Sequence, residues 1–243
     1  MALPKLPSLT LVTDRTLYRA GSGSKANPLP VIEAAIAGGV DIVQLRPRAM
    51  SGDDLALYAV ALRLRELTLG KARFVVTGDI ELAEKCEADG VLLFERSYKP
   101  SEARAFLRTH DASSVVGAFA RTVTGASRAE RGGADYVQTG PAFDQDAEPD
   151  KPNPGLTLVR KMKDAVQVPV IAFGGVNSVE RVVDCLRYGA DGVAVTDAIL
   201  KAPDPQFAAS TLRTALDAAW RALYGEEKAH EVLPIEEQVE GSD

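Results

Sequence analysis

The chain has 243 residues, of which 46% are hydrophobic and 26% charged, which suits one globular domain of barrel size or two small ones. The formal net charge of −6 resides at the end of the chain, because residues 226–243 hold seven acidic residues and one lysine. The remainder is neutral, so we expect no nucleic acid partner. No apolar run is long enough to span a bilayer, the N-terminus lacks the apolar core of a signal peptide, and the two cysteines form no metal or redox pattern. We therefore expect a cytoplasmic protein with no membrane partner.

Short apolar, β-branched runs alternate with segments of helical periodicity along the whole chain. Such runs are typical of parallel strands buried on both faces. The predicted strands cover 9–14, 41–46, 73–76, 91–94, 114–120, 135–139, 168–173 and 192–195, and the predicted helices cover 30–36, 55–67, 80–86, 101–107, 124–131, 156–165, 179–188 and 207–223. Eight strands alternating with eight helices predict an α/β fold, a single-domain (β/α)8 TIM barrel over residues 1–224.

The periodic pattern stops after Gly225. Residues 225–243 are acidic and show little periodicity. A segment of this kind cannot bury enough apolar surface to order itself, so we expect a disordered C-terminal tail.

A short element, in which a small residue precedes an aspartate and an apolar run, recurs along the chain. Its aspartates are Asp41, Asp89, Asp135 and Asp191, and their spacings of 48, 46 and 56 residues each match about two strand–helix units. Each aspartate therefore precedes an even-numbered strand. The N-terminal ends of barrel strands serve stability rather than catalysis, so we interpret these four residues as structural.

Two successive strand ends near the C-terminus suggest a phosphate site. The seventh strand ends in Gly174 and Gly175, and the eighth ends at Val195 and Thr196. Glycines at a strand end let backbone N–H groups approach a ligand closely, and this pair of strand ends binds phosphate in many barrels of this type. The alternative is that the glycines only make tight turns.

Polar side chains follow several other predicted strands. Gln44, Arg46 and Arg48 surround the end of the second strand, and guanidinium groups fit phosphate oxygens in pairs. Salt bridges at the rim of the barrel are the alternative for both arginines. Thr77, Arg121 and Thr139 are expected at the same end of the barrel, as substrate-binding or catalytic groups.

Other chemistries lack the residues they need. The two histidines, His110 and His230, lie at a helix end and in the tail, where neither is placed to act as a general base. No lysine lies within a predicted strand, which argues against a Schiff-base aldolase. What remains is a phosphate-binding barrel that acts by electrostatics and positioning.

The sequence resembles the thiamine-phosphate synthase/TenI superfamily over roughly residues 8–222. The resemblance rests on Gly174 and Gly175 together with segments 11–15 (LVTDR), 38–46 (GGVDIVQLR), 133–137 (GADYV), 140–143 (GPAF) and 189–195 (GADGVAV), which occur in the family's order. Each motif is weak alone, and together they are specific for the superfamily.

The resemblance implies that hydroxymethylpyrimidine diphosphate is joined to a thiazole phosphate, with Mg²⁺-assisted loss of pyrophosphate. It implies that Gln44, Arg46 and Arg48 hold the diphosphate. It also implies that the thiazole phosphate lies on backbone at Gly175 and around Val195 and Thr196. Lys151 is expected to replace the lysine of a family loop that is absent here.

The chain departs from the family at the positions that bind magnesium. The two family carboxylates are replaced by Gly78 and Ser97, and Mg²⁺ needs hard oxygen ligands. Asp79 and Glu95 lie one and two positions away, which suggests a shifted Mg²⁺ site. Arg121 stands where the related thiazole tautomerase has a histidine, and an arginine can supply part of a metal's charge.

Three interpretations stay open. The first is a divergent thiamine-phosphate synthase, a transferase whose leaving-group site is rebuilt by Asp79, Glu95 and Arg121. The second is a TenI-like, metal-independent enzyme that acts on a thiazole phosphate. The third is a non-catalytic barrel that binds a phosphorylated small molecule or has a regulatory role. The oligomeric state stays open as well, a homo-oligomer included.

Overall fold

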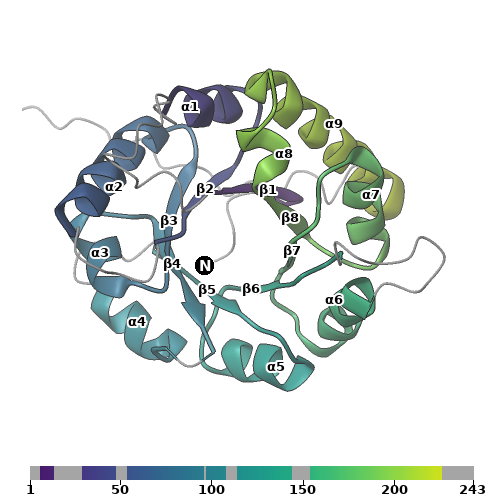
Figure 1. Ribbon diagram of the computed structural model, residues 1–243. Coiled ribbons are helices and arrows are strands. Elements are labelled where there is room, and N and C mark those ends of the chain that lie inside the picture. The colour runs from purple at the N-terminus through teal and green to yellow at the C-terminus, as the bar shows by residue number, and fades with distance from the viewer. Residues whose placement is uncertain are drawn as a thin grey trace, which may run out of the picture.

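A computed structural model of the chain describes residues 6–13, 29–47, 54–95, 97–107, 114–143 and 154–225. Eight parallel strands close into a barrel in sequence order, with helices around the outside (Figure 1). The strands are β1 (Ser8–Val12), β2 (Ile42–Leu45), β3 (Arg73–Thr77), β4 (Gly90–Phe94), β5 (Val115–Phe119), β6 (Tyr136–Thr139), β7 (Val170–Phe173) and β8 (Gly192–Val195). The helices are α1 (Leu29–Ala37), α2 (Asp54–Thr68), α3 (Ile80–Lys85), α4 (Pro100–Leu107), α5 (Val123–Arg131), α6 (Pro154–Ala165), α7 (Val179–Arg187), α8 (Asp197–Leu200) and α9 (Pro205–Tyr224).

The predicted TIM barrel is confirmed, and its strand boundaries shift by at most two residues from those expected. The sequence analysis missed one element, the short helix α8, which begins directly after β8 with Thr196 as its N-cap. The predicted acidic tail, residues 225–243, lies outside the described residues except for Gly225, the C-cap of α9. Among the helices that the structure describes, none combines the length and apolar composition needed to cross a membrane.

Side chains alternate between the inside of the barrel and the layer under the helices. The inner set forms its own cluster, whereas the outer faces of the strands pack with the helices in a larger core. This alternation is the period of two that any strand imposes. Residues of the inner cluster are Val12, Ile42, Val75, Leu92, Val115, Tyr136, Ile171 and Ala194.

The four repeated aspartates tie strand to strand at the N-terminal face of the barrel. Each carboxylate accepts a hydrogen bond from the backbone of the preceding odd-numbered strand and pairs with a cation on a helix, which confirms the structural interpretation. The backbone donors are Leu9, Phe74, Val116 and Val170, at 2.6 to 2.8 Å from Asp41, Asp89, Asp135 and Asp191 respectively. The cations, in the same order, are Arg213, Arg65, Arg104 and Lys163, at 2.6 to 3.1 Å.

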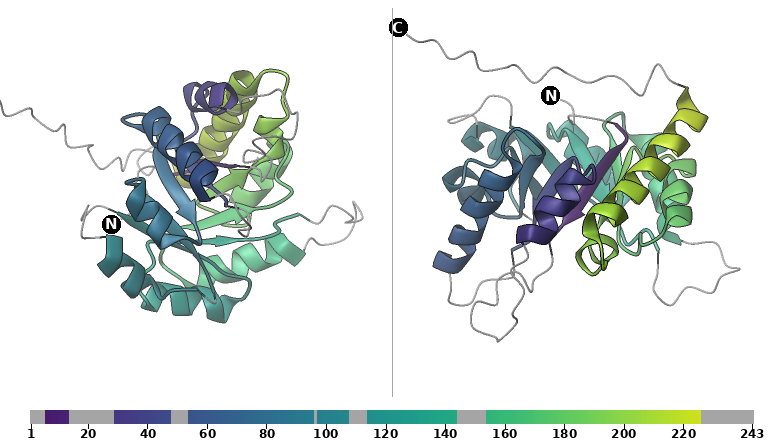
Figure 2. Two further views of the ribbon diagram at one scale, coloured as in Figure 1. Left: turned by 60° about the vertical axis from the view of Figure 1, so that its left-hand side comes forward. Right: turned by 90° about the horizontal axis from the view of Figure 1, so that it is seen from above.

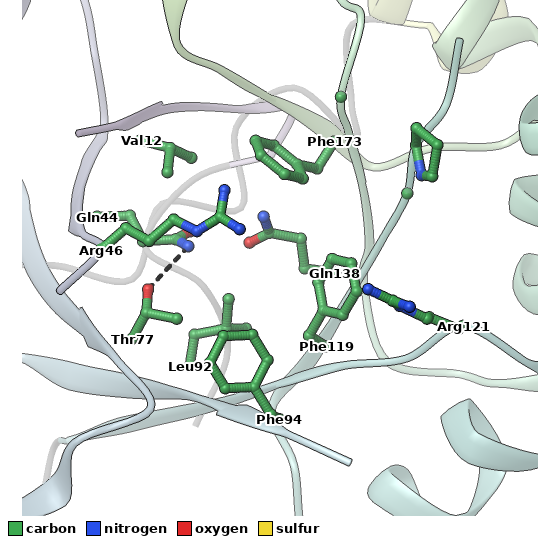
Figure 3. A pocket seen from close by; sticks show the side chains of 13 residues that line it. Val12, Gln44, Arg46, Thr77, Leu92, Phe94, Phe119, Arg121, Gln138 and Phe173 are labelled. Atoms are coloured by element: carbon green, nitrogen blue, oxygen red, sulfur yellow. Dashed lines mark hydrogen bonds between the residues drawn. The ribbon is translucent and has the colours of Figure 1, made fainter. Parts of the chain in front are cut away.

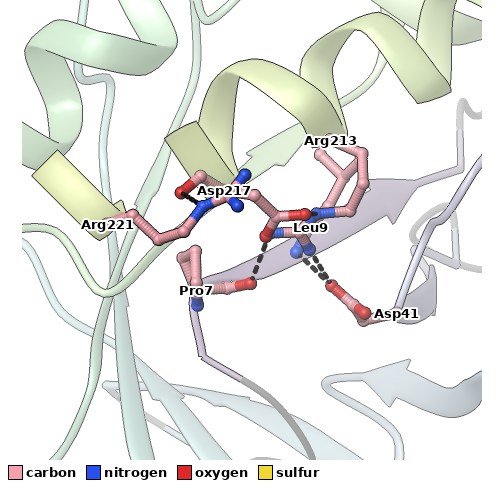
Figure 4. Close-up of polar contacts among 6 residues, drawn as sticks. All are labelled: Pro7, Leu9, Asp41, Arg213, Asp217 and Arg221. Carbon is pink, nitrogen blue, oxygen red and sulfur yellow. Dashed lines mark hydrogen bonds and ion pairs between the residues drawn. The ribbon is translucent and has the colours of Figure 1, made fainter. Parts of the chain in front are cut away.

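The first of these links joins the two ends of the barrel (Figure 4). Arg213, on α9, donates to Asp41 over 2.7 Å and to the carbonyl oxygen of Pro7 over 2.9 Å. Asp217, one turn further along the helix, accepts from the same guanidinium. Helix α9 lies between α1 and α7 on the outside of the barrel (Figures 1 and 2), so the last helix closes the ring against the first strand.

Candidate functional site

A cavity of about 180 Å³ opens at the C-terminal ends of the strands (Figure 3). Active sites of this architecture lie at that face. The cavity is smaller than the ~300–1,000 Å³ typical of sites for drug-sized ligands, so its walls enclose room for one small ring. It is lined by Val12, Gln44, Arg46, Thr77, Leu92, Phe94, Phe119, Arg121, Gln138, Gly140, Pro141, Phe173 and Gly174.

Five of the residues expected from sequence meet in this cavity. Three of them, Gln44, Arg46 and Thr77, come from the neighbouring ends of β2 and β3. The Nε2 atom of Gln44 donates to the Oγ1 atom of Thr77 over 3.0 Å, and the backbone N–H of Arg46 donates to the Oγ1 atom of Thr13 over 3.0 Å. These bonds fix the backbone and side chains at the ends of β1, β2 and β3. Arg121 and Gly174 complete the set from the far side.

Two guanidinium groups reach the cavity from opposite sides (Figure 3). The Cζ atom of Arg46 lies 5.9 Å from the ring centre of Phe173, and that of Arg121 lies 6.0 Å from the ring centre of Phe119. Cations at such distances are attracted by an aromatic face. Phe94 packs edge-on against Phe119, with ring centres 6.3 Å apart. The cavity therefore combines apolar aromatic walls with positive charge, which suits an anionic ligand that carries a flat ring.

The loop after β7 packs tightly against the loop after β6. Gly174 and Gly175 have φ values of +91° and +72°, and a Cβ atom on Gly175 would lie 2.6 Å from the carbonyl oxygen of Phe143. Glycine is therefore required at Gly175 by local packing, apart from any ligand. Arg181, in the first turn of α7, donates to the carbonyl oxygen of Gly175 over 2.6 Å and lies over the Phe143 ring at 4.8 Å.

The remaining predicted binding residues lie beside the cavity or outside the described chain. Gly175, Val195 and Thr196 share the neighbouring ends of β7 and β8 but do not line the cavity. Thr139 is fully buried, and the alternation along β6 turns its side chain away from the barrel interior. Arg48 and Lys151 fall outside the described residues.

Asp79 and Glu95, the predicted magnesium ligands, both accept hydrogen bonds from backbone. Asp79 is the N-cap of α3 and accepts from the N–H of Leu82 over 2.9 Å. Glu95 accepts from the N–H of Arg121 over 3.1 Å. The part of the chain that the structure describes holds no group of three His, Cys, Asp or Glu side chains suited to a metal ion. Magnesium binding by Asp79 and Glu95 stays a prediction.

Tyr136 lies beneath the cavity on the same inward side of β6 as Gln138. Its side chain packs against Gly117, where a Cβ atom would lie 2.2 Å from the Tyr136 Cζ atom. Burial, with a smaller contribution from the charge of Asp135, raises the pKa of Tyr136 far above its ordinary value. The phenol therefore stays protonated and serves as packing at the floor of the site.

Sequence reasoning missed Gln138, Phe173 and Arg181. A signal for Gln138 exists in the sequence, because it is an amide inside an apolar strand and lies two residues after Tyr136, on the same face. Phe173 shares the inward face of β7 with Ile171, two residues earlier. No comparable signal marks Arg181, whose contacts depend on how two loops meet.

Comparisons with known proteins agree with the fold and indicate the family. The family model described as thiamine monophosphate synthase matches residues 9–199. A thiamine-phosphate synthase of Methanoculleus marisnigri is 36% identical over 87% of this chain and 96% of the relative. That of Natronomonas pharaonis is 37% identical over 77% of this chain and 86% of the relative.

A solved structure of thiamine phosphate pyrophosphorylase from Pyrococcus furiosus aligns with a TM-score of 0.71 and 29% identity, over 87% of this chain and 96% of that one. The 3-hexulose-6-phosphate synthase structure, at 21% identity and a TM-score of 0.61, shares the barrel fold. The family match covers all eight strands except the first residue of β1. The chain therefore belongs to the thiamine-phosphate synthase/TenI family.

Proposed function

We propose that this chain is a thiamine-phosphate synthase-like transferase, which joins hydroxymethylpyrimidine diphosphate to a thiazole phosphate and releases pyrophosphate. One observation carries the proposal: Gln44 and Arg46 converge on a single cavity at the catalytic face of a barrel that belongs to this family. The relatives named above carry the same activity in their names.

The reaction breaks the bond between the pyrimidine methylene carbon and the diphosphate oxygen, and the electron pair leaves with pyrophosphate. The thiazole nitrogen then forms a bond to that carbon. Arg46 is placed to donate hydrogen bonds to the departing oxygens, and Arg121 adds positive charge from the opposite side. The faces of Phe119 and Phe173 favour the positive charge that develops on the pyrimidine methylene.

The family resemblance implies that magnesium assists the loss of pyrophosphate. When bound, the metal would neutralise charge on the diphosphate. Asp79 and Glu95 remain the proposed ligands, each through the carboxylate oxygen that is not bonded to backbone. Arg48 and Lys151 remain proposed phosphate-binding residues.

One observation favours a second candidate, a binding protein without turnover. The described lining of the cavity contains no carboxylate, imidazole or lysine side chain, so it offers no general base. The synthase reaction does not require one, because the nucleophile is a neutral ring nitrogen. A metal-independent enzyme on a thiazole phosphate would need such a group and is less well supported.

The test is formation of thiamine phosphate by the purified full chain from both substrates, with magnesium and with EDTA. Product formation supports the transferase. Binding of the pyrimidine diphosphate without product, at saturating concentrations of both substrates, favours the binding protein. This proposal includes a phosphorylated small-molecule substrate and a cytoplasmic location. It includes no nucleic acid partner, and it is compatible with a homo-oligomer.

A further inference from the structure

Gln138 carries an unsatisfied hydrogen-bond acceptor inside the cavity. Its side chain is 1% exposed, and its Oε1 atom has no hydrogen-bond partner among the residues that the structure describes. Gln44, by comparison, bonds to Thr77 within the same cavity. A buried polar atom without a partner costs free energy, so a site that keeps one points to a ligand that satisfies it.

The orientation of this amide follows from its neighbour. Figure 3 shows the carboxamide of Gln138 beside the guanidinium of Arg46. A guanidinium carries only N–H donors, so the oxygen of the amide, rather than its nitrogen, belongs on that side. No hydrogen bond joins the two groups, so the oxygen keeps an open acceptor position, and a ligand atom that meets it must be a donor.

The surroundings of Gln138 restrict the shape of the ligand. Phe119 is its direct neighbour across the β5–β6 pair, and Phe173 is the next inward residue on β7, on its other side. Both rings line the cavity, together with Leu92 and Val12. A flat ring fits between such walls, and its edge rather than its face reaches the amide.

We propose that Gln138 is a specificity-determining residue, whose Oε1 atom accepts a hydrogen bond from an exocyclic amino group on a heteroaromatic ring held between Phe119 and Phe173. The inference rests on the proposed function, in which that ring is the aminopyrimidine of the diphosphate substrate. Arg46 holds the diphosphate while Gln138 recognises the ring edge, so adjacent residues select the two ends of one ligand.

A competing role for Gln138 is to orient Arg46 without touching the ligand. The two roles predict that different ligands lose affinity when Gln138 is replaced. Loss of an amino contact affects only a ring that bears the amino group. If Gln138 only orients Arg46, its replacement should weaken the binding of every diphosphate, including inorganic pyrophosphate.

The experiment is calorimetric titration of the full chain and its Gln138→Met variant with three probes: the aminopyrimidine diphosphate, its analogue with hydrogen in place of the amino group, and inorganic pyrophosphate. Methionine matches glutamine in length and makes no comparable hydrogen bond. We expect the unmodified chain to prefer the amino compound by about tenfold, and the variant to bind both pyrimidines equally. Pyrophosphate affinity should not change.

Gln206→Met, the same change on the exposed surface of α9, is the control and should leave all three affinities unchanged. Should Gln138→Met melt early, Gln138→Leu takes its place. The inference is overturned if the variant keeps the amino preference, or if it loses pyrophosphate affinity by the same factor. Amino-dependent binding without product formation would refute only the proposed function, whereas no binding of either pyrimidine would refute both.

Discussion

The carboxylate of Glu95 accepts a hydrogen bond from the backbone N–H of Arg121 over 3.1 Å, so the residue after β4 anchors the loop that follows β5. Gly125 leaves room for this contact, because a Cβ atom there would lie 2.2 Å from the same Glu95 oxygen. One exposed acid thus holds the backbone of the arginine at the cavity rim, in space that Gly125 leaves open.

Replacement of Glu95 by alanine should lower kcat/KM by about threefold to tenfold, because an exposed hydrogen bond to a carboxylate contributes only about 1 kcal/mol. Glu95→Gln keeps an oxygen that can accept from the same N–H and should recover most of the loss. Steady-state rates of thiamine phosphate formation measure both. A Glu95→Gln variant as impaired as the alanine variant would show that the carboxylate charge matters, as in a metal site.

Substitution of Arg46 tests the leaving-group site. Arg46→Ala should lower kcat/KM by about 100-fold, because hydrogen bonds to charged groups contribute about 1.5–3 kcal/mol each. Arg46→Lys keeps the charge without the paired donors, so its kcat/KM should lie between those of the unmodified chain and Arg46→Ala. Arg63→Ala, an exposed arginine of α2 paired with Glu66, is the control. An unchanged rate in Arg46→Ala would contradict the proposed function.

Asp79 separates capping from metal binding. Asp79→Asn preserves a side-chain oxygen at the N-cap of α3, whereas Asp79→Ala removes it and should cost about 1 kcal/mol of unfolding free energy. If Asp79 binds Mg²⁺, the asparagine variant should need a much higher magnesium concentration for half-maximal rate. Urea unfolding and a magnesium titration provide the two readouts. Identical magnesium dependence in all three proteins would exclude Asp79 as a ligand.

The aspartate links at the N-terminal face should matter for stability and not for catalysis. Asp191 accepts from Val170 and pairs with Lys163 over 2.8 Å, with its side chain 6% exposed. Asp191→Ala should lower the unfolding free energy by about 3 kcal/mol, because it leaves a lysine and a backbone donor without their partner. Asp184→Ala, which removes an exposed pair with Arg187, should cost under about 1 kcal/mol. Equal losses in the two variants would contradict the structural role of Asp191.

Both cysteines should resist modification in the folded chain. Burial raises the pKa of Cys86 from 9.0 to about 11 and that of Cys185 from 9.0 to about 12. Unfolded thiols ionise first, so their contribution to stability is full below pH 9.0 and falls as the pH rises toward 11 to 12. At pH 8, labelling by a thiol reagent should follow the rate of unfolding. Rapid labelling of the native chain would contradict their burial.

The sequence indicated the site residues that depend on strand position alone. Arg46 and Thr77 lie just after or at a strand end, Gln44 lies one residue before one, and the barrel brings all such ends to one face. Gln138 was missed because the sequence analysis assigned its neighbour Thr139 to the site, and adjacent residues of a strand point to opposite faces. Helix α8 was missed because four residues are too few for a helical period to appear.

The positions of the four linking aspartates could be predicted from the sequence, but the cations that pair with them could not. Their spacing located Asp41, Asp89, Asp135 and Asp191 at the even strands from the sequence alone. Their cations lie 24 to 172 residues away and come from helices whose orientation only packing decides. Arg213 in particular belongs to the last helix, and nothing in its local sequence connects it with the first strand.

The long separation in sequence between Asp41 and Arg213 has a consequence for folding during synthesis. The links of Asp89, Asp135 and Asp191 join residues that are close in sequence, so each can form while synthesis continues. The link from Asp41 to Arg213 cannot, because its two partners are 172 residues apart in the order of translation. A nascent chain released before α9 would lack the link between Asp41 and Arg213, and also the helix that lies between α1 and α7. The outer ring of helices can therefore close between α1 and α9 only once the last described helix has been synthesised.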